Sequence, residues 1–397
     1  MGKKILQLGA GHLQLHSITQ WKNAGYEVHV LDKCMDAPGF NCANAYSNID
    51  IIDTAAIINY ARENKIDAII AVNDAGAVPA ADASEALGLK GVSPQTARLS
   101  TDKGLMRETW KLKALSQPKF IIVNSSELIK QAITDLGFPV IIKPCLNWGS
   151  KGVASVMKYD DIEFAIEFTL KNDRNGRFII EELIQGTEMT YEGLVKDGHV
   201  QILSRSDKVH QQHQHFNVAM ELNYPPAISE KLITLADILV VDAAKALNII
   251  NGALHCELMV NETGAYLVEM ASRPGGGHIF GQIVEAQCGV PMPLSLAKIF
   301  LNEEVDITPQ FQKGVSYRFF SPPHGVFHGV EGIEEAALMK GVIDLGFSMA
   351  PGTIVDDFSG DADRPGYLVT VAETRQGAID TANKVVNALN FKANNIL

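Results

Sequence analysis

Residues 139–153 read PVIIKPCLNWGSKGV, and this stretch is the most informative about the fold of the chain. The β-branched run Val140–Lys143 predicts a strand, which Pro144 closes because proline donates no N–H to a ladder. The following loop contains Gly149, Ser150, Gly152 and Val153. Two glycines and a serine let the backbone N–H groups of such a loop approach phosphate oxygens closely. The stretch therefore predicts a strand followed by a phosphate-binding loop.

Two lysines accompany this loop. Lys103 opens a predicted helix over Asp102–Leu115, and Lys143 ends the strand. Lysines from separate elements can supply positive charge to the same polyphosphate. A lone lysine at a strand end is also a common solvated residue, so both interpretations stay open.

The acidic stretch Ile179–Glu188 follows the loop and reads IIEELIQGTE. The carboxylate of Glu181 can accept a hydrogen bond from an adenine amino group, and the extended backbone at Glu182 and Leu183 can pair with the ring edge. Glu188 can accept from ribose hydroxyls. The alternative is an acidic strand end that faces water.

Two further glutamates lie on a predicted hairpin, Ala253–Val260 and Tyr266–Ala271. If the strands pair, Glu257 and Glu269 can lie on one face. Carboxylate oxygens on adjacent strands suit Mg²⁺, which keeps substrate phosphates in its remaining positions. Two exposed glutamates are the alternative, which the apolar surroundings disfavour because buried acids need partners.

The N-terminal part alternates strands and helices up to about Ser100, which predicts a parallel α/β sheet. Its first strand ends in Gly9-Ala10-Gly11, a turn that also occurs in nicotinamide-dependent oxidoreductases, and Asp32 lies at the end of the second strand. Gln14 stands where a third glycine of the dinucleotide fingerprint belongs. A dinucleotide site is therefore a weak alternative, since such turns also serve close helix packing.

The whole chain has 397 residues, of which 46% are hydrophobic and 20% charged, with a net charge of −12. The length predicts two or three domains. The acidic balance argues against a nucleic-acid partner. The five cysteines form no CxxC pair, which argues against a disulfide framework or a zinc knuckle. The start MGKKILQLGAG has no signal-peptide pattern and no apolar stretch is long enough to span a membrane, so we expect a cytoplasmic enzyme.

The order of these pieces resembles the ATP-grasp superfamily over nearly the whole chain. The resemblance runs from the N-terminal domain through Asp102-Lys103, the loop after Lys143 and Glu181–Glu188, to Glu257, Glu269 and the run that begins at Arg273. It implies an α/β fold of three parts. These are a Rossmann-like pre-ATP-grasp domain at 1–100, a two-part ATP-grasp domain at 101–300 with a lid at about 120–188, and a C-terminal α+β unit at 301–397.

The resemblance also implies roles for individual residues. Lys103 and Lys143 would contact ATP phosphates under the glycine loop, Glu181 and Leu183 would meet adenine, and Glu188 would meet ribose. Glu257 and Glu269 would hold Mg²⁺, with Mn²⁺ as an alternative ion. One position departs from the family, because Ala271 stands where many members carry a metal-binding asparagine. The number and geometry of the metal ions therefore stay open.

The implied reaction transfers the γ-phosphoryl group of ATP to a carboxylate, and an amine then attacks the acyl phosphate. The guanidinium of Arg273 can fork onto a substrate carboxylate. The N–H groups of Gly275 and Gly276 can stabilise the oxyanion. A structural salt bridge is the alternative for Arg273. Arg318 is a second candidate for carboxylate binding, although buried ion pairing explains it nearly as well.

The type of ligase depends on two further runs. Arg273–Ile279 and the C-terminal segments Tyr317–Phe320 and Arg364–Tyr367 are most similar to amino-acid and dipeptide ligases. Purine-biosynthesis members that use formate or bicarbonate share parts of the pattern and are the alternative. A catalytically inactive nucleotide-binding regulator is a third hypothesis. The family's habit implies a homodimer.

Three histidines, at positions 210, 213 and 215, stand in an unusual polar segment. Their spacing is compatible with a metal site, but no cysteine or carboxylate pattern completes one. We expect instead a polar loop over the substrate pocket.

Overall fold

The computed structural model describes residues 2–147, 149, 151–212, 217–355 and 363–394. The chain forms two compact units, each assembled from several segments. The first unit comprises 1–118, 190–204 and 229–310, and the second comprises 119–189, 205–228 and 311–397. Both units contain strands and helices, as an α/β fold requires. The three-part division at residues 100 and 300 stays a prediction.

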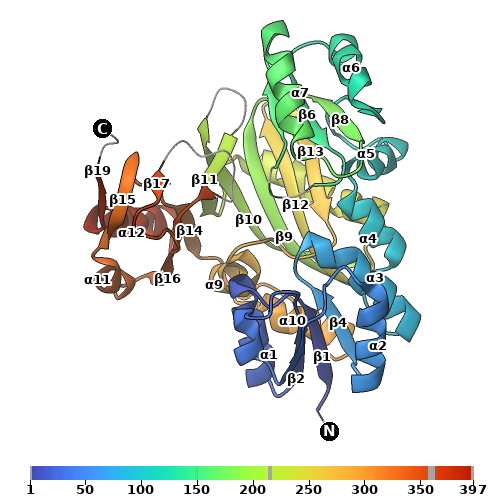
Figure 1. Ribbon diagram of the computed structural model, residues 1–397, viewed down its shortest axis with the longest axis vertical. Coiled ribbons are helices and arrows are strands. Elements are labelled where there is room, and N and C mark those ends of the chain that lie inside the picture. The colour runs from blue at the N-terminus through green and yellow to red at the C-terminus, as the bar shows by residue number, and fades with distance from the viewer. Residues whose placement is uncertain (1, 148, 150, 213–216, 356–362, 395–397) are drawn as a thin grey trace. The chain divides into compact units, whose positions relative to one another are not determined.

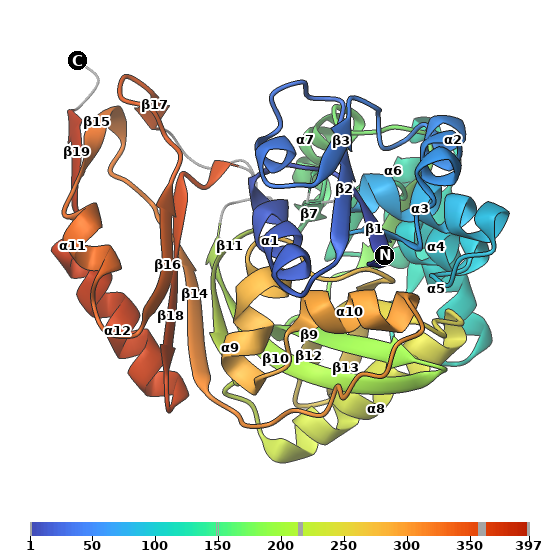
Figure 2. The ribbon, with the colours of Figure 1, turned by 90° about the horizontal axis from the view of Figure 1, so that it is seen from below.

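The first unit begins with a parallel sheet in the strand order β3-β2-β1-β4. Figure 2 shows α1 on one side of this sheet and α2 and α3 on the other. Buried Leu6 and Leu8 of β1 pack against Ile57 of α2 and Ala83 of α3. The elements are β1 (Lys4–Leu8), α1 (Leu15–Asn23), β2 (Glu27–Leu31), β3 (Ala45–Ser47), α2 (Thr54–Asn64), β4 (Ala68–Ala71), α3 (Asp74–Leu87), α4 (Pro94–Thr101) and α5 (Lys103–Leu112).

The glycine turn after β1 is held by hydrogen bonds from other residues of the N-terminal domain. Asp32 accepts the N–H of Ala10 at 2.8 Å with one carboxylate oxygen and the N–H of Cys34 at 2.9 Å with the other. The N–H of Gly39 donates to the carbonyl of Ala10 at 2.7 Å, so residue 39 lies directly over the turn. Each oxygen of Asp32 thus accepts a backbone N–H of the N-terminal domain. The turn is therefore packed closely within its own domain, which favours the packing interpretation over the dinucleotide alternative.

The rest of the first unit is built on the strands β13-β12-β9-β10, of which β9 and β10 continue into the second unit. The predicted hairpin of β12 and β13 is confirmed, and its register pairs Glu257 with Glu269. Residues Ile279–Ile283 form a π-helical turn that is followed by α9. The elements are β9 (Thr187–Lys196), β10 (His199–Gln212), α8 (Glu230–Ala246), β12 (Gly252–Asn261), β13 (Gly264–Ala271), α9 (Val284–Cys288) and α10 (Met292–Phe300).

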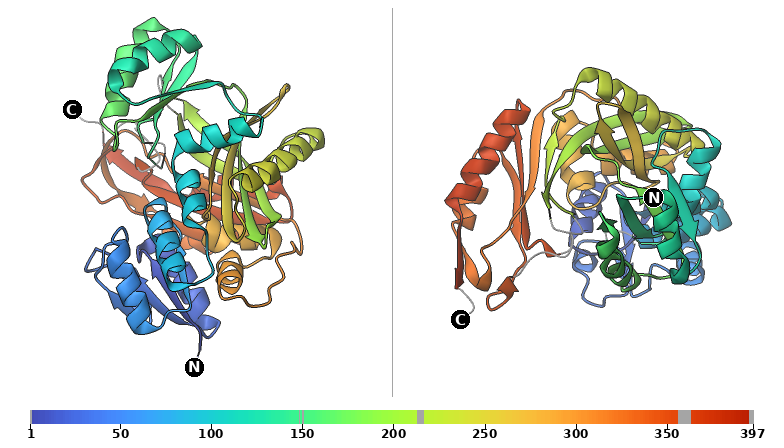
Figure 3. Two further views of the ribbon diagram at one scale, coloured as in Figure 1. Left: turned by 90° about the vertical axis from the view of Figure 1, so that its right-hand side faces the viewer. Right: turned by 90° about the horizontal axis from the view of Figure 1, so that it is seen from above.

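The second unit contains a small sheet in the order β5-β8-β6-β7, which carries α6 and α7 on one face (Figure 3). Val140 and Ile142 of β6 point into the core beneath the two helices, together with Phe178 and Ile180 of β8. Because side chains alternate along a strand, Lys143 and Glu181 lie on the opposite face. The elements are β5 (Phe120–Val123), α6 (Ile129–Leu136), β6 (Val140–Pro144), β7 (Ala154–Val156), α7 (Ile162–Leu170) and β8 (Phe178–Glu182).

The remaining strands of the second unit follow the order β10-β11-β14-β18-β16, and β15 pairs with β17 and β19. Helix α12 packs along β14 and β18, where Ala382 and Val385 meet Leu368 (Figure 1). The elements are β11 (Asn217–Tyr224), β14 (Gly314–Phe319), β15 (Gly325–Glu331), α11 (Ile333–Ala337), β16 (Val342–Phe347), β17 (Ile354–Val355), β18 (Gly366–Ala372), α12 (Arg375–Ala388) and β19 (Asn390–Asn394). Within the described ranges, no helix combines the length and apolar character needed to cross a membrane.

Candidate active site

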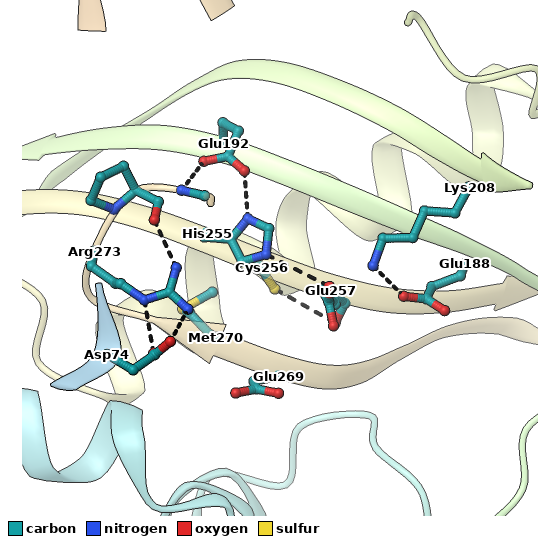
Figure 4. Close-up of polar contacts among 12 residues, drawn as sticks. Asp74, Glu188, Glu192, Lys208, His255, Cys256, Glu257, Glu269, Met270 and Arg273 are labelled. Carbon is teal, nitrogen blue, oxygen red and sulfur yellow. Dashed lines mark hydrogen bonds and ion pairs between the residues drawn. The ribbon is translucent and has the colours of Figure 1, made fainter. Parts of the chain in front are cut away.

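The two glutamates of the β12–β13 hairpin are direct cross-strand partners. Partners in an antiparallel pair point to the same side of the sheet, so both carboxylates lie on one face (Figure 4). Glu269 also receives the ammonium group of Lys103, whose Nζ donates to Oε1 at 3.0 Å. Burial lowers the pKa of Lys103, but the Glu269 carboxylate outweighs it and the pKa rises, so the lysine stays charged. Three of the predicted site residues are therefore neighbours in the first unit.

A bulge beside Glu269 is held by an arginine that sequence inspection did not single out. The register shifts between Glu257 and Leu258, which leaves Val268 as the extra residue of β13. Arg107 is 1% exposed and donates to the carbonyls of Leu267 at 2.6 Å and Val268 at 2.9 Å. Bulges re-aim side chains next to active sites. Arg107 thereby holds the stretch of backbone that carries Glu269.

A histidine lies between two carboxylates on the same face (Figure 4). His255 contacts the fully buried Glu192 of β9 through Nδ1 and approaches Glu257 through Nε2, with Nε2 at 3.6 Å from Oε1. Burial lowers the pKa of His255, but the two carboxylates outweigh it and raise the pKa to about 9. The imidazole is therefore a cation at neutral pH, and Nδ1–H donates to Glu192.

Arg273 lies at the end of β13 and pairs with Asp74, the first residue of α3. Its Nε and Nη2 donate to the two oxygens of Asp74 at 2.8 and 2.6 Å, and Nη1 donates to the carbonyl of Pro274 at 2.7 Å. Burial lowers the pKa of Arg273, whereas Asp74 raises it and prevails. The salt bridge considered as the alternative is thus present. Three of the five guanidinium N–H groups are used, and two remain for a ligand.

The glycine run after Arg273 has one residue without space for a side chain. The N–H of Gly275 donates to Glu192 at 2.9 Å, and a Cβ added to Gly275 would lie 2.3 Å from a Glu192 oxygen. A Cβ on Gly276 would meet nothing within 4 Å. In this structure the N–H of Gly275 is already donated, so Gly276 is the better candidate for an oxyanion donor.

In the second unit, Lys143 and Glu181 form a buried ion pair. Nζ of Lys143 donates to Oε2 of Glu181 at 2.7 Å, and the two residues are 7% and 2% exposed. They come from neighbouring strands, because β6 and β8 pair antiparallel. The predicted phosphate ligand and the predicted adenine ligand are therefore in direct contact.

The backbone expected to meet adenine is partly engaged within the same sheet. The N–H of Glu182 donates to the carbonyl of Lys119 at 2.9 Å, and that of Leu183 donates to Pro139 at 3.1 Å. Glu182 is the last residue of β8, and its carboxylate accepts the N–H of Lys119 at 3.4 Å. To pair with an adenine ring, the Leu183 N–H would have to give up its hydrogen bond to Pro139.

The loop after β6 has left-handed backbone at both glycines, with φ of +67° at Gly149 and +74° at Gly152. A Cβ at Gly152 would lie 2.8 Å from Asn172, so both space and conformation require glycine there. Val153 continues into β7. Ser150, the fourth predicted member of the loop, lies outside the described residues.

Glu188 is contacted by two cationic or titratable side chains of β10. Its oxygens lie 2.5 Å from Nζ of Lys208 and 3.1 Å from Nε2 of His210. His210 thus belongs beside the predicted ribose ligand. His213 and His215 lie outside the described residues, so the polar-loop interpretation of that segment stays a prediction.

Arg318 on β14 is engaged by its own unit. Nε lies 3.1 Å from Glu221 of β11, and Nη1 donates to Asn383 of α12 at 2.7 Å. The register of β11 and β14 makes Glu221 and Arg318 direct partners. Ion pairing, the alternative explanation of this arginine, is therefore present in a partly buried form, and its role in carboxylate binding stays a proposal.

Besides Arg107, four residues of the site were missed in the sequence. They are Asp74, Glu192, Lys208 and His255. A signal existed for His255, since it stands two positions before Glu257 and therefore shares its face. Glu192 stands in an otherwise apolar strand, which marks a carboxylate that needs a partner. Asp74 and Lys208 carried no comparable signal.

The donor set fits a divalent cation. Two carboxylates face one another, Lys103 takes one oxygen of Glu269, and Oε2 of Glu269 has no partner among the described residues. The described part of the chain holds no group of three or more His, Cys, Asp or Glu that could bind a metal. Mg²⁺ suits such a sparse protein contribution, because it is commonly held by one or two carboxylates plus substrate phosphates.

Two family models match this chain. The ATP-grasp domain matches residues 136–282, and the L-amino acid ligase C-terminal domain 2 matches residues 318–393. Both lie where the sequence patterns place them. Glu181, Glu257 and Glu269 fall within the first match and Arg318 begins the second.

Three known proteins illustrate the likeness. The formate-dependent phosphoribosylglycinamide formyltransferase of Burkholderia vietnamiensis is 29% identical over 187 residues, which are 46% of this chain and 46% of that protein. This chain thus matches about half the length of that curated relative. The L-amino acid ligase of Bacillus licheniformis has a TM-score of 0.84 at 20% identity, over 99% of each chain. The biotin carboxylase domain of the Hydrogenobacter thermophilus 2-oxoglutarate carboxylase has a TM-score of 0.77 at 18% identity, over 99% of this chain and 91% of that one. The chain therefore has the ATP-grasp fold and carries an ATP-grasp domain followed by an L-amino acid ligase C-terminal domain.

Proposed function

We propose that this chain is an ATP-dependent carboxylate–amine ligase that joins amino acids and releases ADP and phosphate. The observation that carries the proposal is the cross-strand pair Glu257 and Glu269 beside Lys103. Such a pair is suited to a metal-bound polyphosphate. The match of the C-terminal region to an L-amino acid ligase domain supports amino acids as substrates.

The residues proposed to contact the nucleotide are those that the sequence predicts. Lys103, Lys143 and the backbone of 149–153 contact the phosphates, and phosphoryl transfer depends mainly on such positioning and charge neutralisation. Glu181, Glu182 and Leu183 meet adenine, and Glu188 meets ribose. Mg²⁺, held by Glu257 and Glu269 when bound, neutralises phosphate charge, and Mn²⁺ has the same ligand preference. The related biotin carboxylase domain was crystallised with MgADP, which supports these ligands.

The reaction proceeds in two balanced steps. A carboxylate oxygen of the first amino acid bonds to the γ-phosphorus while the bond to the bridging oxygen breaks, so that ADP leaves and an acyl phosphate remains. The amine of the second amino acid attacks the acyl carbon, phosphate leaves and the amine loses a proton. Arg273 binds a substrate carboxylate with its two remaining N–H groups. The N–H of Gly276 stabilises the oxyanion of the second step.

A second candidate is a purine-type enzyme that uses formate or bicarbonate as its carboxylate. The match to a formate-dependent formyltransferase favours it. The C-terminal match to an amino-acid ligase domain disfavours it. We further propose a cytoplasmic homodimer, since the related biotin carboxylase domain was crystallised as a dimer. Sedimentation at several protein concentrations tests this assembly.

The deciding experiment incubates the purified protein with ATP, Mg²⁺ and pooled amino acids, and identifies the nucleotide product and any new mass. ADP, phosphate and a dipeptide mass support the proposal. ADP and phosphate with formate or bicarbonate alone would favour the purine-type candidate. AMP with pyrophosphate would contradict the acyl-phosphate route.

A further inference from the structure

Glu192 is a buried carboxylate for which the proposed reaction has no use. It lies on β9 between Tyr191 and Gly193 and is completely buried. A carboxylate taken out of water is costly unless hydrogen bonds and an opposite charge compensate it. Its contacts therefore indicate why it is there.

The first contact is with the loop after β13. Oε2 of Glu192 accepts the N–H of Gly275 at 2.9 Å. The approach is so close that a Cβ on Gly275 would lie 2.3 Å from Oε1 and 2.9 Å from Nδ1 of His255. Glu192 thus fixes the first glycine of the run that follows Arg273.

The second contact is with His255, whose Nδ1 faces Oε1 of Glu192 while Nε2 faces Glu257 (Figure 4). His255 and Glu257 alternate on one strand and share a face. The imidazole therefore bridges the buried carboxylate to a carboxylate of the predicted metal pair.

We propose that Glu192 is a positioning residue that holds two parts of the site together, the glycine loop through Gly275 and the carboxylate of Glu257 through His255. The inference rests on the proposed function, because it takes Glu257 as a metal ligand. Groups that orient a metal ligand typically affect metal affinity by about 10–100-fold when they are changed.

The test measures Mn²⁺ binding by electron paramagnetic resonance, in the presence of ADP and without turnover. Glu192→Gln keeps the shape and retains an acceptor for Gly275, but it removes the charge that faces His255. We expect Mn²⁺ affinity to fall about 10–100-fold. Glu303→Gln is the matched control, since Glu303 accepts from Tyr26 in the same unit and lies outside the site. Its Mn²⁺ affinity should equal that of the wild type.

A double-variant cycle shows whether the effect passes through the histidine. The single variant His255→Asn and the double variant Glu192→Gln, His255→Asn should lose about the same Mn²⁺ affinity. Both interrupt the same connection from Glu192 through His255 to Glu257. Additive losses, or wild-type affinity in folded Glu192→Gln, would overturn the inference. If Glu192→Gln does not fold, His255→Asn decides alone, and unchanged Mn²⁺ affinity in that variant refutes the bridge.

The same experiment separates the inference from the proposed function. A wild-type protein that binds Mn²⁺ in this way but ligates no amino acid would refute the function and leave the positioning role standing. A wild-type protein that ligates amino acids while Glu192→Gln binds Mn²⁺ normally would refute the role and leave the function standing. A wild-type protein that binds no Mn²⁺ would refute the metal assignment of Glu257 and the inference with it.

Discussion

At the scale of single residues, every predicted cation of the described site already has a carboxylate partner. Lys103 binds Glu269, Lys143 binds Glu181 and Arg273 binds Asp74. Charges that are mostly buried need such compensation when no ligand is present. Removing one partner of such a pair therefore destabilises the protein, and this cost can be measured separately from the proposed chemistry.

Lys143→Met is expected to lower the free energy of unfolding by about 3–5 kcal/mol, because it leaves Glu181 buried without its cation. Urea unfolding without nucleotide measures this loss. The double variant Lys143→Met, Glu181→Leu removes both charges and should recover most of the stability. A double variant as unstable as the single one would show that the ion pair is not the cause.

Arg273→Lys is expected to raise KM for the amino-acid substrates at least tenfold, because an ammonium group cannot form the two parallel hydrogen bonds of a guanidinium. KM for ATP should change by less than about twofold. Arg273 is not among the residues proposed to contact the nucleotide, and substitutions away from a site usually change free energies by less than about 0.5 kcal/mol. Steady-state kinetics with each substrate varied in turn provides the measurement. Equal rises in both KM values would assign Arg273 to the structure rather than to the carboxylate.

At the scale of elements, the hairpin and the glycine loop form one assembly. Arg107 donates hydrogen bonds to the backbone at the bulge in β13, and the register places Glu257 opposite Glu269. Gly275 donates its N–H to Glu192. Each connection is made by a buried polar group rather than by apolar packing alone. The loop should therefore tolerate a methyl group at one glycine and not at its neighbour.

Gly275→Ala is expected to lower the free energy of unfolding by about 1–3 kcal/mol or more, the usual cost of overpacking, because its Cβ would overlap Glu192. Gly276→Ala is the matched control, with open space at its Cβ and an expected change within about 0.5 kcal/mol. Thermal or urea unfolding of both variants measures the difference. Equal stability of the two variants would contradict the described packing.

At the scale of the whole molecule, we expect the nucleotide to bind in the ATP-grasp domain and not at the N-terminal sheet. ATP with Mg²⁺ at about 100 times its Kd should stabilise the protein by about 2.7 kcal/mol, and NAD should not stabilise it. A thermal-shift assay with each ligand measures this. Chelation of the metal should abolish most of the ATP effect, and stabilisation by NAD alone would reopen the dinucleotide hypothesis.

The sequence by itself determined the fold class and most of the residues proposed for the site. The strand before Lys143, the left-handed glycines of its loop and the β12–β13 hairpin are local features. Alternation, chain reversal and glycine conformation are encoded within a few neighbouring positions. That is why the pairing of Glu257 with Glu269 was predictable from two strands and a turn.

The partners of these residues were decided only by tertiary structure. Asp74 and Arg273 are far apart in the chain, as are Glu192 and Gly275, and no local pattern encodes which buried charges meet. The same holds for Asp32, one oxygen of which accepts the N–H of Ala10 in the glycine turn. A buried ion or backbone N–H takes whichever partner the packed core brings within hydrogen-bond distance, and this depends on long-range contacts that sequence spacing does not contain.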